Sequence, residues 1–180
     1  MRVIAGSARG VPLVAPRDRG TRPITDRVKE TLFAILGERV PDARVLDLYA
    51  GSGAIGIEAL SRGATSADFV EHARAALDAL RTNLAKTRLD GDARVHAIDV
   101  DRFLAAPDGG PWDLAILDPP YEARAIVAPL MALLPHLAPG ATVVVKHFWR
   151  TEVPAVDRLA TTRQRRFGET MLTYLELEDA

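Results

Sequence analysis

The sequence predicts a three-layer, doubly wound α/β domain around a mostly parallel sheet of seven strands. Apolar, strand-like segments alternate with helical patterns along most of the chain, which is typical of this class. A glycine-rich turn joins the first of these strands to a helix, and two extended runs close the chain. The 180 residues suffice for one domain with a sizeable core.

Five strands are expected in the parallel part of the sheet, separated by helical or turn segments and centred on Val45, Phe69, Val95, Leu114 and Val143. The two final runs, on either side of residues 167–169, should pair as an antiparallel hairpin. If the first and fourth strands are neighbours where the winding reverses, their carboxyl ends open into one crevice. Ligands of doubly wound sheets bind in such a crevice.

A small extension precedes the first of these strands. Residues 2–5 and 11–14 flank a glycine-containing segment and predict a β-hairpin. Thr25 can cap a helix over residues 26–36, whose apolar stripe predicts one buried face. We therefore expect residues 1–40 to form the extension and residues 41–180 the core of a single globular unit.

Composition excludes several classes of protein. Hydrophobic residues make up 48% of the chain, too many for a mainly disordered protein. There is no cysteine, and the four histidines lack the spacing of zinc ligands, so we expect neither disulfides nor a metal. Prolines interrupt the apolar stretch 127–145, which predicts helix, turn and strand instead of a membrane span. The amino terminus lacks the apolar core of a signal peptide, so a cytoplasmic protein is expected.

The segment 45–56 reads as a strand, a Gly-x-Gly-x-x-Gly turn and the start of a helix. Glycines permit close backbone approach, and the N–H groups that open a helix face whatever binds there. Such a fingerprint is weak by itself. Here Glu71 follows Gly51 by 20 residues, at the end of the next strand, where a carboxylate can accept both ribose hydroxyls. The context predicts a nucleoside-containing cofactor without saying which.

Two aspartates bear on the choice of cofactor. Asp47, at the end of the first strand, would repel a pyrophosphate and attract the α-ammonium of a methionine moiety. The alternative for Asp47 is a helix or turn cap. Asp99, after the third strand, can receive an adenine amino group or act as the N-cap of the next helix.

The tetrapeptide Asp118-Pro119-Pro120-Tyr121 ends the fourth strand. It combines a carboxylate, a stiff turn whose prolines have no N–H, and an aromatic ring. This set suits a flat ring that bears an amino group, with Tyr121 stacked on the base. The alternative is that the prolines stop a strand and the tyrosine packs in the core.

The net charge of −1 is low for a nucleic-acid-binding protein, but basic residues crowd the first thirty positions, where they are Arg2, Arg9, Arg17, Arg19, Arg22, Arg27 and Lys29. We interpret this extension as a segment that binds RNA phosphates, with residues 22–30 near the mouth of the pocket. The alternative is a solvated surface. A second basic cluster, residues 163–166, is a weaker candidate for the same role.

These motifs together resemble the class I S-adenosylmethionine-dependent methyltransferases of the N-methylating type, and most closely the bacterial 16S rRNA (guanine-966, N2) methyltransferases. The similarity covers nearly the whole chain, in segments 1–10, 22–33, 46–53, 58–64 and 118–121. Two positions depart from the pattern: Ile24 stands where threonine is common, and Lys146 precedes His147 where glutamate is common. We assign no role to Lys146.

The resemblance implies a Rossmann-like fold, S-adenosyl-L-methionine as cofactor with S-adenosyl-L-homocysteine as product, and 16S rRNA or the small ribosomal subunit as partner. A monomer is expected, without DNA or membrane. The implied catalytic residues are Asp118, Pro119, Pro120 and Tyr121. The implied cofactor-binding residues are Asp47, Tyr49, Ala50, Gly51, Ser52, Gly53, Glu71, His72, Asp99, Val100 and Asp118. The RNA-binding residues that we assign are Arg2, Arg9, Arg22, Thr25 and Arg27.

Three alternatives stay open on the motifs alone. The DPPY site also fits methylation of another RNA guanine or of adenine N6 in DNA, although the chain has no sizeable DNA-recognition domain. The glycine fingerprint with Glu71 would also serve an NAD-binding oxidoreductase, against which Asp47 and the DPPY turn argue. A non-catalytic cofactor-binding module would leave the DPPY turn unexplained.

Overall fold

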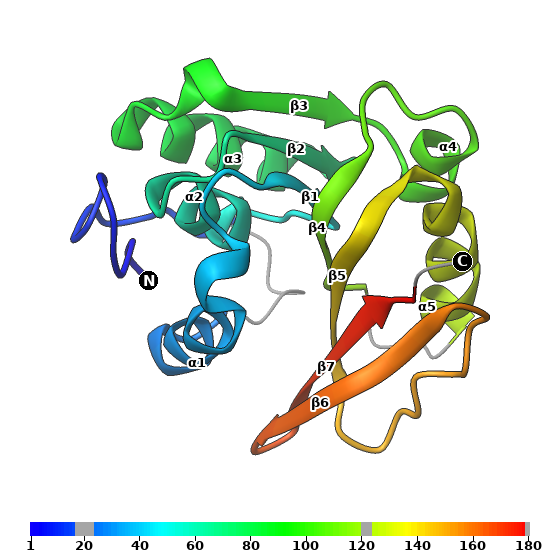
Figure 1. Cartoon of the computed structure of the whole chain (residues 1–180). Helices are drawn as coiled ribbons and strands as arrows, with labels where there is room; N and C mark the ends of the chain where they lie inside the picture. The colour runs from blue at the N-terminus through cyan, green and yellow to red at the C-terminus, as the bar shows by residue number, and fades with distance from the viewer. Residues whose placement is uncertain (17–23, 120–123, 179–180) are drawn as a thin grey trace.

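The computed structural model describes residues 1–16, 24–119 and 124–178. One sheet of seven strands runs through it (Figure 1). The strands are β1 (Arg44–Leu48), β2 (Ser66–Glu71), β3 (Ala93–Ala97), β4 (Trp112–Leu117), β5 (Leu137–Phe148), β6 (Leu159–Phe167) and β7 (Thr170–Leu177). Their order is β3-β2-β1-β4-β5-β7-β6. The first five strands are parallel, whereas β7 is antiparallel to both β5 and β6.

The order confirms the doubly wound α/β prediction and the closing hairpin. It also places β1 beside β4, with Leu48 paired to Leu117, so the winding reverses between these two strands. The carboxyl ends of β1 and β4 therefore meet at one edge of the sheet, where ligands of such folds bind.

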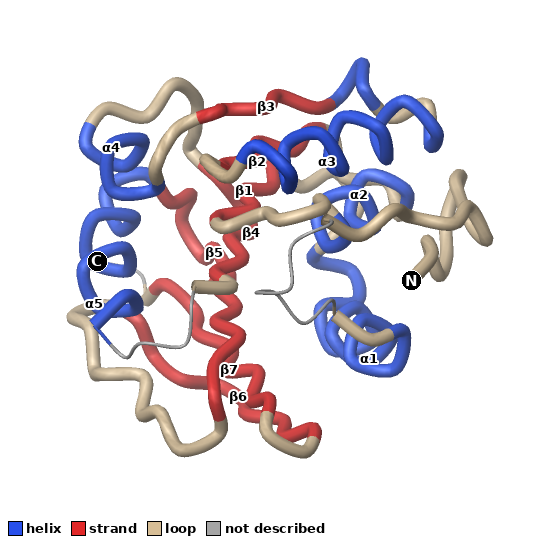
Figure 2. The backbone as a smooth tube through the Cα atoms, turned by 180° about the vertical axis from the view of Figure 1, so that it is seen from behind, coloured by secondary structure: helices blue, strands red, loops and turns tan. Residues whose placement is uncertain are grey.

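Helices cover both faces of the sheet (Figure 2). The helices are α1 (Asp26–Leu36), α2 (Ala54–Ser61), α3 (Arg74–Thr87), α4 (Val100–Ala105) and α5 (Arg124–Leu133), with short 3-10 turns η1 (Gly37–Arg39), η2 (Asp90–Asp92) and η3 (Leu134–His136). The first three helices pack on one core that includes Val45 and Ile116, and the last two pack on a second core with Leu46 and Leu117. Successive strand residues point to opposite faces, so parallel strands buried on both sides read as unbroken apolar runs.

The two arms of the amino-terminal hairpin pair through a bridge between Arg2 and Pro12 and through backbone hydrogen bonds of 2.9–3.1 Å, although neither arm is a regular strand. The N–H groups of Ile4 and Ala5 donate instead to Glu58 of α2, at 2.8 and 3.0 Å. Pro12 has no N–H to give to a ladder. A buried carboxylate thus takes the donors that a longer hairpin would need, and the segment is held against α2.

The other local expectations agree with the structure. Helix α1 begins at Asp26 and ends at Leu36 as predicted, with Thr25 as its N-cap accepting a hydrogen bond from the Val28 N–H. The apolar stretch 127–145 is divided among α5, η3 and β5. Within the three described ranges, no helix is long and apolar enough to cross a bilayer.

Candidate active site

The glycine turn follows β1 directly and is shaped by positive φ angles at Tyr49 (60°), Gly51 (55°) and Gly53 (76°). The Gly53 N–H donates to the Ala50 carbonyl at 2.8 Å, which closes the turn. A Cβ on Gly53 would lie 2.2 Å from Leu80 Cδ1, so a larger residue does not fit there. A Cβ on Gly51 would meet no heavy atom within 4 Å. The turn is therefore packed on the protein side and open at Gly51.

Glu71, at the end of β2, organises the turn through its carboxylate. Its Oε2 accepts the Gly51 N–H at 2.9 Å, and its Oε1 accepts the N–H groups of His72 and Ala73 at 2.8 Å each. The carboxylate thus links the glycine turn to the start of α3. Because each carboxylate oxygen has two lone pairs, Oε2 can also accept a hydroxyl from a ligand.

Asp47 is buried, and its Oδ2 accepts the N–H of Gly56 in the first turn of α2 at 2.9 Å. The helix-capping alternative for Asp47 is therefore realised. Burial raises the pKa of Asp47 to about 8, with smaller contributions from the charges of Asp118 and Glu71 and an opposing effect of the Gly56 N–H. These electrostatic contributions show that three carboxylates predicted from separate motifs converge on one place.

Tyr49 and Asp99 lie on the α4 side of this place. Asp99 is the N-cap of α4, and its Oδ1 accepts the Asp101 N–H at 2.9 Å. Burial raises the pKa of Tyr49 to about 12, helped by the charges of Asp101 and Asp99, so the phenol stays neutral. Among the other predicted cofactor-binding side chains, Val100 is buried and His72 is exposed.

Asp118 follows β4, and its N–H donates to the Leu48 carbonyl at 3.4 Å. This hydrogen bond ties the start of the DPPY segment to the end of β1, beside the glycine turn. Of the Asp118 side chain, 31% is exposed, while Pro119 is buried. Pro120 and Tyr121 lie outside the described residues.

Lys146, near the end of β5, forms an ion pair with Asp118. Its Nζ lies 2.7 Å from both carboxylate oxygens, and its side chain is 11% exposed. Burial raises the pKa of Asp118, and the Lys146 ammonium lowers it again. Asp118 thus remains partly exposed while it contacts the Lys146 ammonium through both oxygens. Sequence reasoning assigned Lys146 no role; the signal was a single lysine at the end of an otherwise apolar strand.

The amino-terminal candidates Arg2, Arg9, Thr25 and Arg27 are all exposed. Arg2 Nε lies 3.3 Å from Asp26 Oδ2. Arg17, Arg19 and Arg22 lie outside the described residues. Lys29, which we counted with this basic cluster, is instead fully buried beside Glu58, at 3.1 Å. Burial lowers the pKa of Lys29 against the attraction of Glu58, so this lysine is structural and not part of the basic surface.

A family profile described as "Conserved hypothetical protein 95" matches residues 1–176. The chain belongs to this family.

Several relatives of the chain carry methyltransferase names. The chain is 38% identical over 176 residues to "Putative rRNA methyltransferase YlbH" of Bacillus subtilis, covering 94% of this chain and 95% of that protein. It is 45% identical over 122 residues to "Ribosomal RNA small subunit methyltransferase D" of Escherichia coli, covering 68% of this chain and 61% of that protein. The solved structure of "Putative methyltransferase yhhF" from Escherichia coli superposes with a TM-score of 0.86 at 37% identity, over 99% and 98% of the two chains.

Asn83 of α3 is a further structurally important residue that the sequence analysis did not identify. It is fully buried, and its Nδ2 donates to the carbonyls of Ser52 and Val14 at 2.9 Å each. Its Oδ1 accepts the Val14 N–H at 2.7 Å. Asn83 therefore joins the amino-terminal extension to the glycine turn. An asparagine on the core face of an amphipathic helix was the available signal.

Two of the four histidines have separate hydrogen-bond partners. His96 Nε2 lies 2.8 Å from Asp68 Oδ1, and His147 Nε2 lies 2.8 Å from Thr173 Oγ1. Among the residues that the structure describes, no group of three or more His, Cys, Asp or Glu side chains is placed to hold a metal ion.

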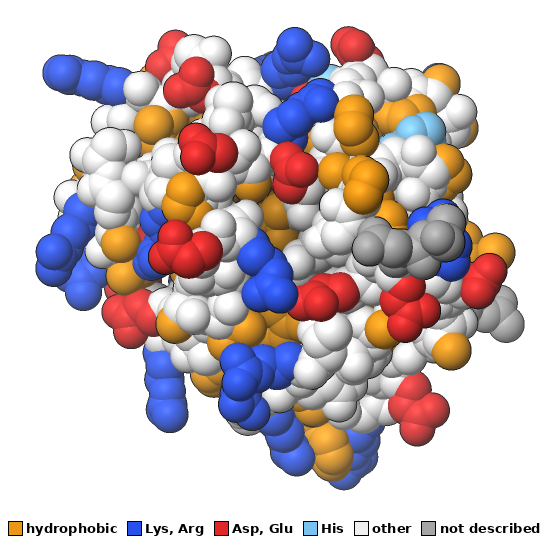
Figure 3. Space-filling model, in the orientation of Figure 1, with side chains coloured by type: hydrophobic (Ala, Val, Ile, Leu, Met, Phe, Trp, Pro, Cys, Tyr) orange, Lys and Arg blue, Asp and Glu red, His pale blue; other side chains and the backbone are white. Residues whose placement is uncertain are grey.

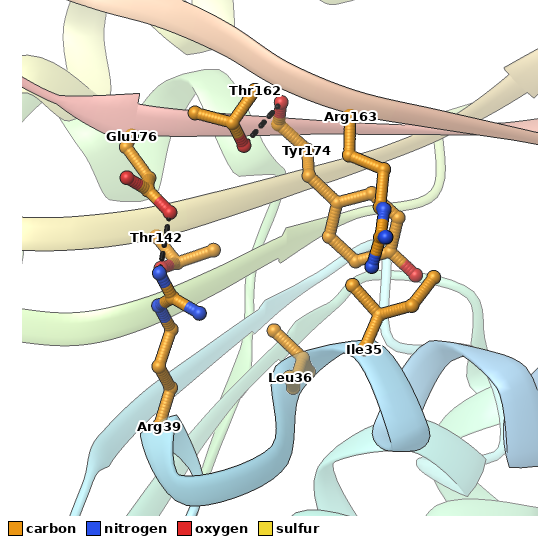
Figure 4. A pocket seen from close by; sticks show the side chains of 8 residues that line it. All are labelled: Ile35, Leu36, Arg39, Thr142, Thr162, Arg163, Tyr174 and Glu176. Carbon is orange, nitrogen blue, oxygen red and sulfur yellow. Dashed lines mark hydrogen bonds and ion pairs between the residues drawn. The ribbon is translucent and has the colours of Figure 1, made fainter.

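A cavity of about 260 Å³ lies away from the predicted site, between the end of α1 and strands β5, β7 and β6 (Figure 4). It is lined by Ile35, Leu36, Arg39, Thr142, Thr162, Arg163, Tyr174 and Glu176. Apart from Arg163, which belongs to the weaker basic cluster 163–166, none of these is a predicted site residue. We take the carboxyl ends of β1, β2 and β4, which bear Asp47, Glu71 and Asp118, as the candidate active site.

Proposed function

We propose that this chain transfers a methyl group from S-adenosyl-L-methionine to the exocyclic N2 of a guanine in 16S rRNA, in the cytoplasm, on an assembling or assembled small ribosomal subunit. The observation that carries this proposal is the hydrogen bond from Asp118 to Leu48, which brings the amino-group acceptor beside the glycine turn. Family membership and 45% identity to a protein named as a ribosomal RNA small subunit methyltransferase support it.

The glycine turn and Glu71 fit the ribose of the cofactor. The open space at Gly51 lets a ligand approach the backbone there, and Glu71 Oε2 still has a lone pair for a ribose hydroxyl. Tyr49, Ala50, Ser52, Gly53 and His72 would line the same place, as backbone or flanking groups.

The two ends of the cofactor would meet aspartates. We assign Asp99 and Val100 to the adenine, because Asp99 is exposed at the start of α4 and Val100 supplies an apolar surface. We assign Asp47 to the α-ammonium. The raised pKa of Asp47 means that an arriving cation would draw its carboxyl into the charged form.

Asp118 is the residue that acts on the guanine. A guanine amino group is a poor nucleophile because its lone pair is delocalised into the ring. Hydrogen bonds to Asp118 and to the Pro119 carbonyl would bend the nitrogen toward tetrahedral geometry. The carboxylate also offsets the positive charge that grows on the nitrogen, which lowers the activation barrier by roughly a few kcal/mol.

Bound S-adenosylmethionine supplies an electrophilic methyl group on a sulfonium sulfur. With the cofactor held at the glycine turn and the amino group at Asp118, the nitrogen lone pair would take up the methyl group, the sulfur–carbon electron pair would return to sulfur, and a proton would leave the nitrogen for water. The target base must leave its stack to reach such a site. Tyr121 would stack on the base. Arg2, Arg9, Arg22, Thr25 and Arg27 of the extension 1–40 would contact RNA outside the core 41–180.

The proposal is tested by methyl transfer from labelled S-adenosylmethionine to unmodified small subunits, naked rRNA and DNA, with identification of the product nucleoside. We expect N2-methylguanine on rRNA or subunits, and its loss in Asp118→Ala. Methylated adenine in DNA would favour the DNA alternative. Absence of transfer together with binding of a nicotinamide dinucleotide would overturn the assignment of the cofactor.

A further inference from the structure

The β6–β7 hairpin presents an unusual edge to the sheet. Strand β6 is the outermost strand, and its residues 161–166 are all exposed. Successive side chains of a strand point to opposite faces, so both faces of this strand are open over six residues. The segment contains Arg163, Arg165 and Arg166 and no acidic residue.

The positive charge of this edge has no counterpart in the ion pairs of residues 1–16, 24–119 and 124–178. Neither Arg150 nor the three arginines of β6 form an ion pair with another residue that the structure describes, whereas Glu176 on β7 pairs with Arg39 at 2.6 Å. Figure 3 shows Lys and Arg side chains gathered along the lower edge of the molecule, where Figure 1 has the turn of the hairpin. A chain of net charge −1 thus carries a concentrated positive edge.

An aromatic side chain lies within this positive edge. The guanidinium carbons of Arg166 and Arg150 lie 3.7 and 4.7 Å from the centre of the Trp149 ring. Arg166 is held in place because its Nε donates to the Gly168 carbonyl at 2.8 Å. Planar aromatic and guanidinium groups are the surfaces on which unpaired nucleic-acid bases stack.

The same group is held at the end of the strand that carries Lys146. The Trp149 N–H donates to the Glu169 carbonyl at 2.9 Å, which ties the turn of the hairpin to the end of β5. Lys146, which contacts Asp118, is three residues before Trp149. Three residues of extended chain span about 10 Å. A nucleotide next to one bound at Asp118 would therefore come within reach of Trp149 and Arg166.

We propose that Trp149, Arg150, Arg163, Arg165 and Arg166, called here the hairpin surface, bind rRNA beside the target nucleotide. One base stacks on the group formed by the partly buried Trp149 ring and the guanidiniums that contact it, and phosphates bind the arginines. This inference rests on the proposed function. Charged residues also protect edge strands from pairing with other chains. Positive or negative side chains could fill that role equally well. It does not explain a tryptophan flanked by guanidiniums at the end of the strand that carries Lys146.

The test compares Arg163→Gln/Arg165→Gln with a matched control, Arg81→Gln/Arg94→Gln, whose arginines are exposed on α3 and on β3 at the opposite edge of the sheet. Binding of a 16S rRNA fragment is measured by fluorescence anisotropy over a range of KCl concentrations. The hairpin variant should lose affinity about tenfold, and the plot of log affinity against log salt should become shallower by about 1.5, as expected for two lost phosphate contacts. Its KM for RNA should rise while kcat and cofactor affinity stay unchanged.

Tryptophan fluorescence gives an independent readout. Trp112 is fully buried, so quenching on addition of RNA reports on Trp149, and Trp149→Phe should abolish it. If the wild type methylates rRNA but the hairpin variant matches the control in RNA affinity and salt dependence, the inference is overturned and the proposed function stands. Absence of quenching by bound RNA would also count against it. Wild-type protein that binds cofactor but methylates no rRNA would overturn the proposed function and this inference together.

Discussion

Lys146 Nζ lies 2.7 Å from both carboxylate oxygens of Asp118, so the ends of β4 and β5 are joined by an ion pair at the proposed site of methyl transfer. Each carboxylate oxygen keeps a further lone pair, so Asp118 can accept a hydrogen bond from an amino group while Lys146 remains in contact. The lysine would hold the carboxylate ionised and fixed in direction. Lys146 is therefore a positioning residue for Asp118.

Asp118→Asn should lower kcat by about 10²-fold or more, because an amide cannot offset positive charge on the target nitrogen. Cofactor affinity should fall less than kcat, although Asp118 is also among the predicted cofactor-binding residues. Single-turnover methyl transfer and calorimetric titration with S-adenosylmethionine measure the two effects separately. A variant with wild-type kcat would contradict the role of this carboxylate.

Lys146→Met should shift the pH dependence of the reaction. Burial raises the pKa of Asp118 and Lys146 counteracts it, so removal of the ammonium raises this pKa further. Transfer needs the ionised carboxylate, so the acidic limb of the pH–rate profile should move to higher pH. Lys146→Arg should keep the wild-type profile. Superimposable profiles for the methionine variant and the wild type would exclude this coupling.

Glu71→Ala should weaken cofactor binding by about tenfold or more, since a charged hydrogen bond to the ligand is worth about 1.5–3 kcal/mol. It also removes the acceptor for the N–H groups of Gly51, His72 and Ala73. The free energy of unfolding should therefore fall by about 1–3 kcal/mol. Titration calorimetry and urea unfolding give the two numbers. Unchanged cofactor affinity in a destabilised variant would assign Glu71 to structure alone.

Asp47 should make the protein less stable as pH rises. Its pKa is raised from 3.8 to about 8 in the folded state, so between these pH values the folded protein holds a proton that the unfolded chain has released. The free energy of unfolding should fall through this window, by up to about 1.4 kcal/mol per pH unit. Asp47→Asn should flatten the decline between pH 5 and 7.5, and Asp92→Asn, on an exposed turn, should not. If the free energy of unfolding has the same slope against pH in the wild type and in both variants, the pKa of Asp47 is not raised.

Lys29→Met should destabilise the fold by about 3–5 kcal/mol, because it leaves the buried carboxylate of Glu58 without its buried cation. Arg62→Gln is the matched control. Arg62 contacts the same carboxylate at 2.8 Å but is 24% exposed, so its loss should cost no more than about 1 kcal/mol. Denaturant unfolding ranks the two variants, and a smaller effect at Lys29 than at Arg62 would reverse this interpretation.

Local sequence patterns were sufficient for most of the secondary structure. The strand around Val45, the glycine turn and the helix after Thr25 each depend on neighbours within a few positions, so periodicity, glycines and caps reveal them. The same holds for Glu71, whose spacing from Gly51 follows from one strand–turn–helix–strand unit. The hairpin at the amino terminus was predicted too regular, because the acceptor for Ile4 and Ala5 is Glu58, more than fifty residues away.

Contacts between distant segments came from the packing of the sheet. Lys146 meets Asp118 because β4 and β5 are neighbours, Lys29 is buried because α1 packs against α2, and Asn83 reaches Ser52 across the glycine turn. A pattern in the chain records which face of a helix or strand is buried, but not which partner that face will meet. The sequence therefore determined the elements and the carboxylates of the site. The charge that accompanies Asp118 was decided when β4 and β5 paired.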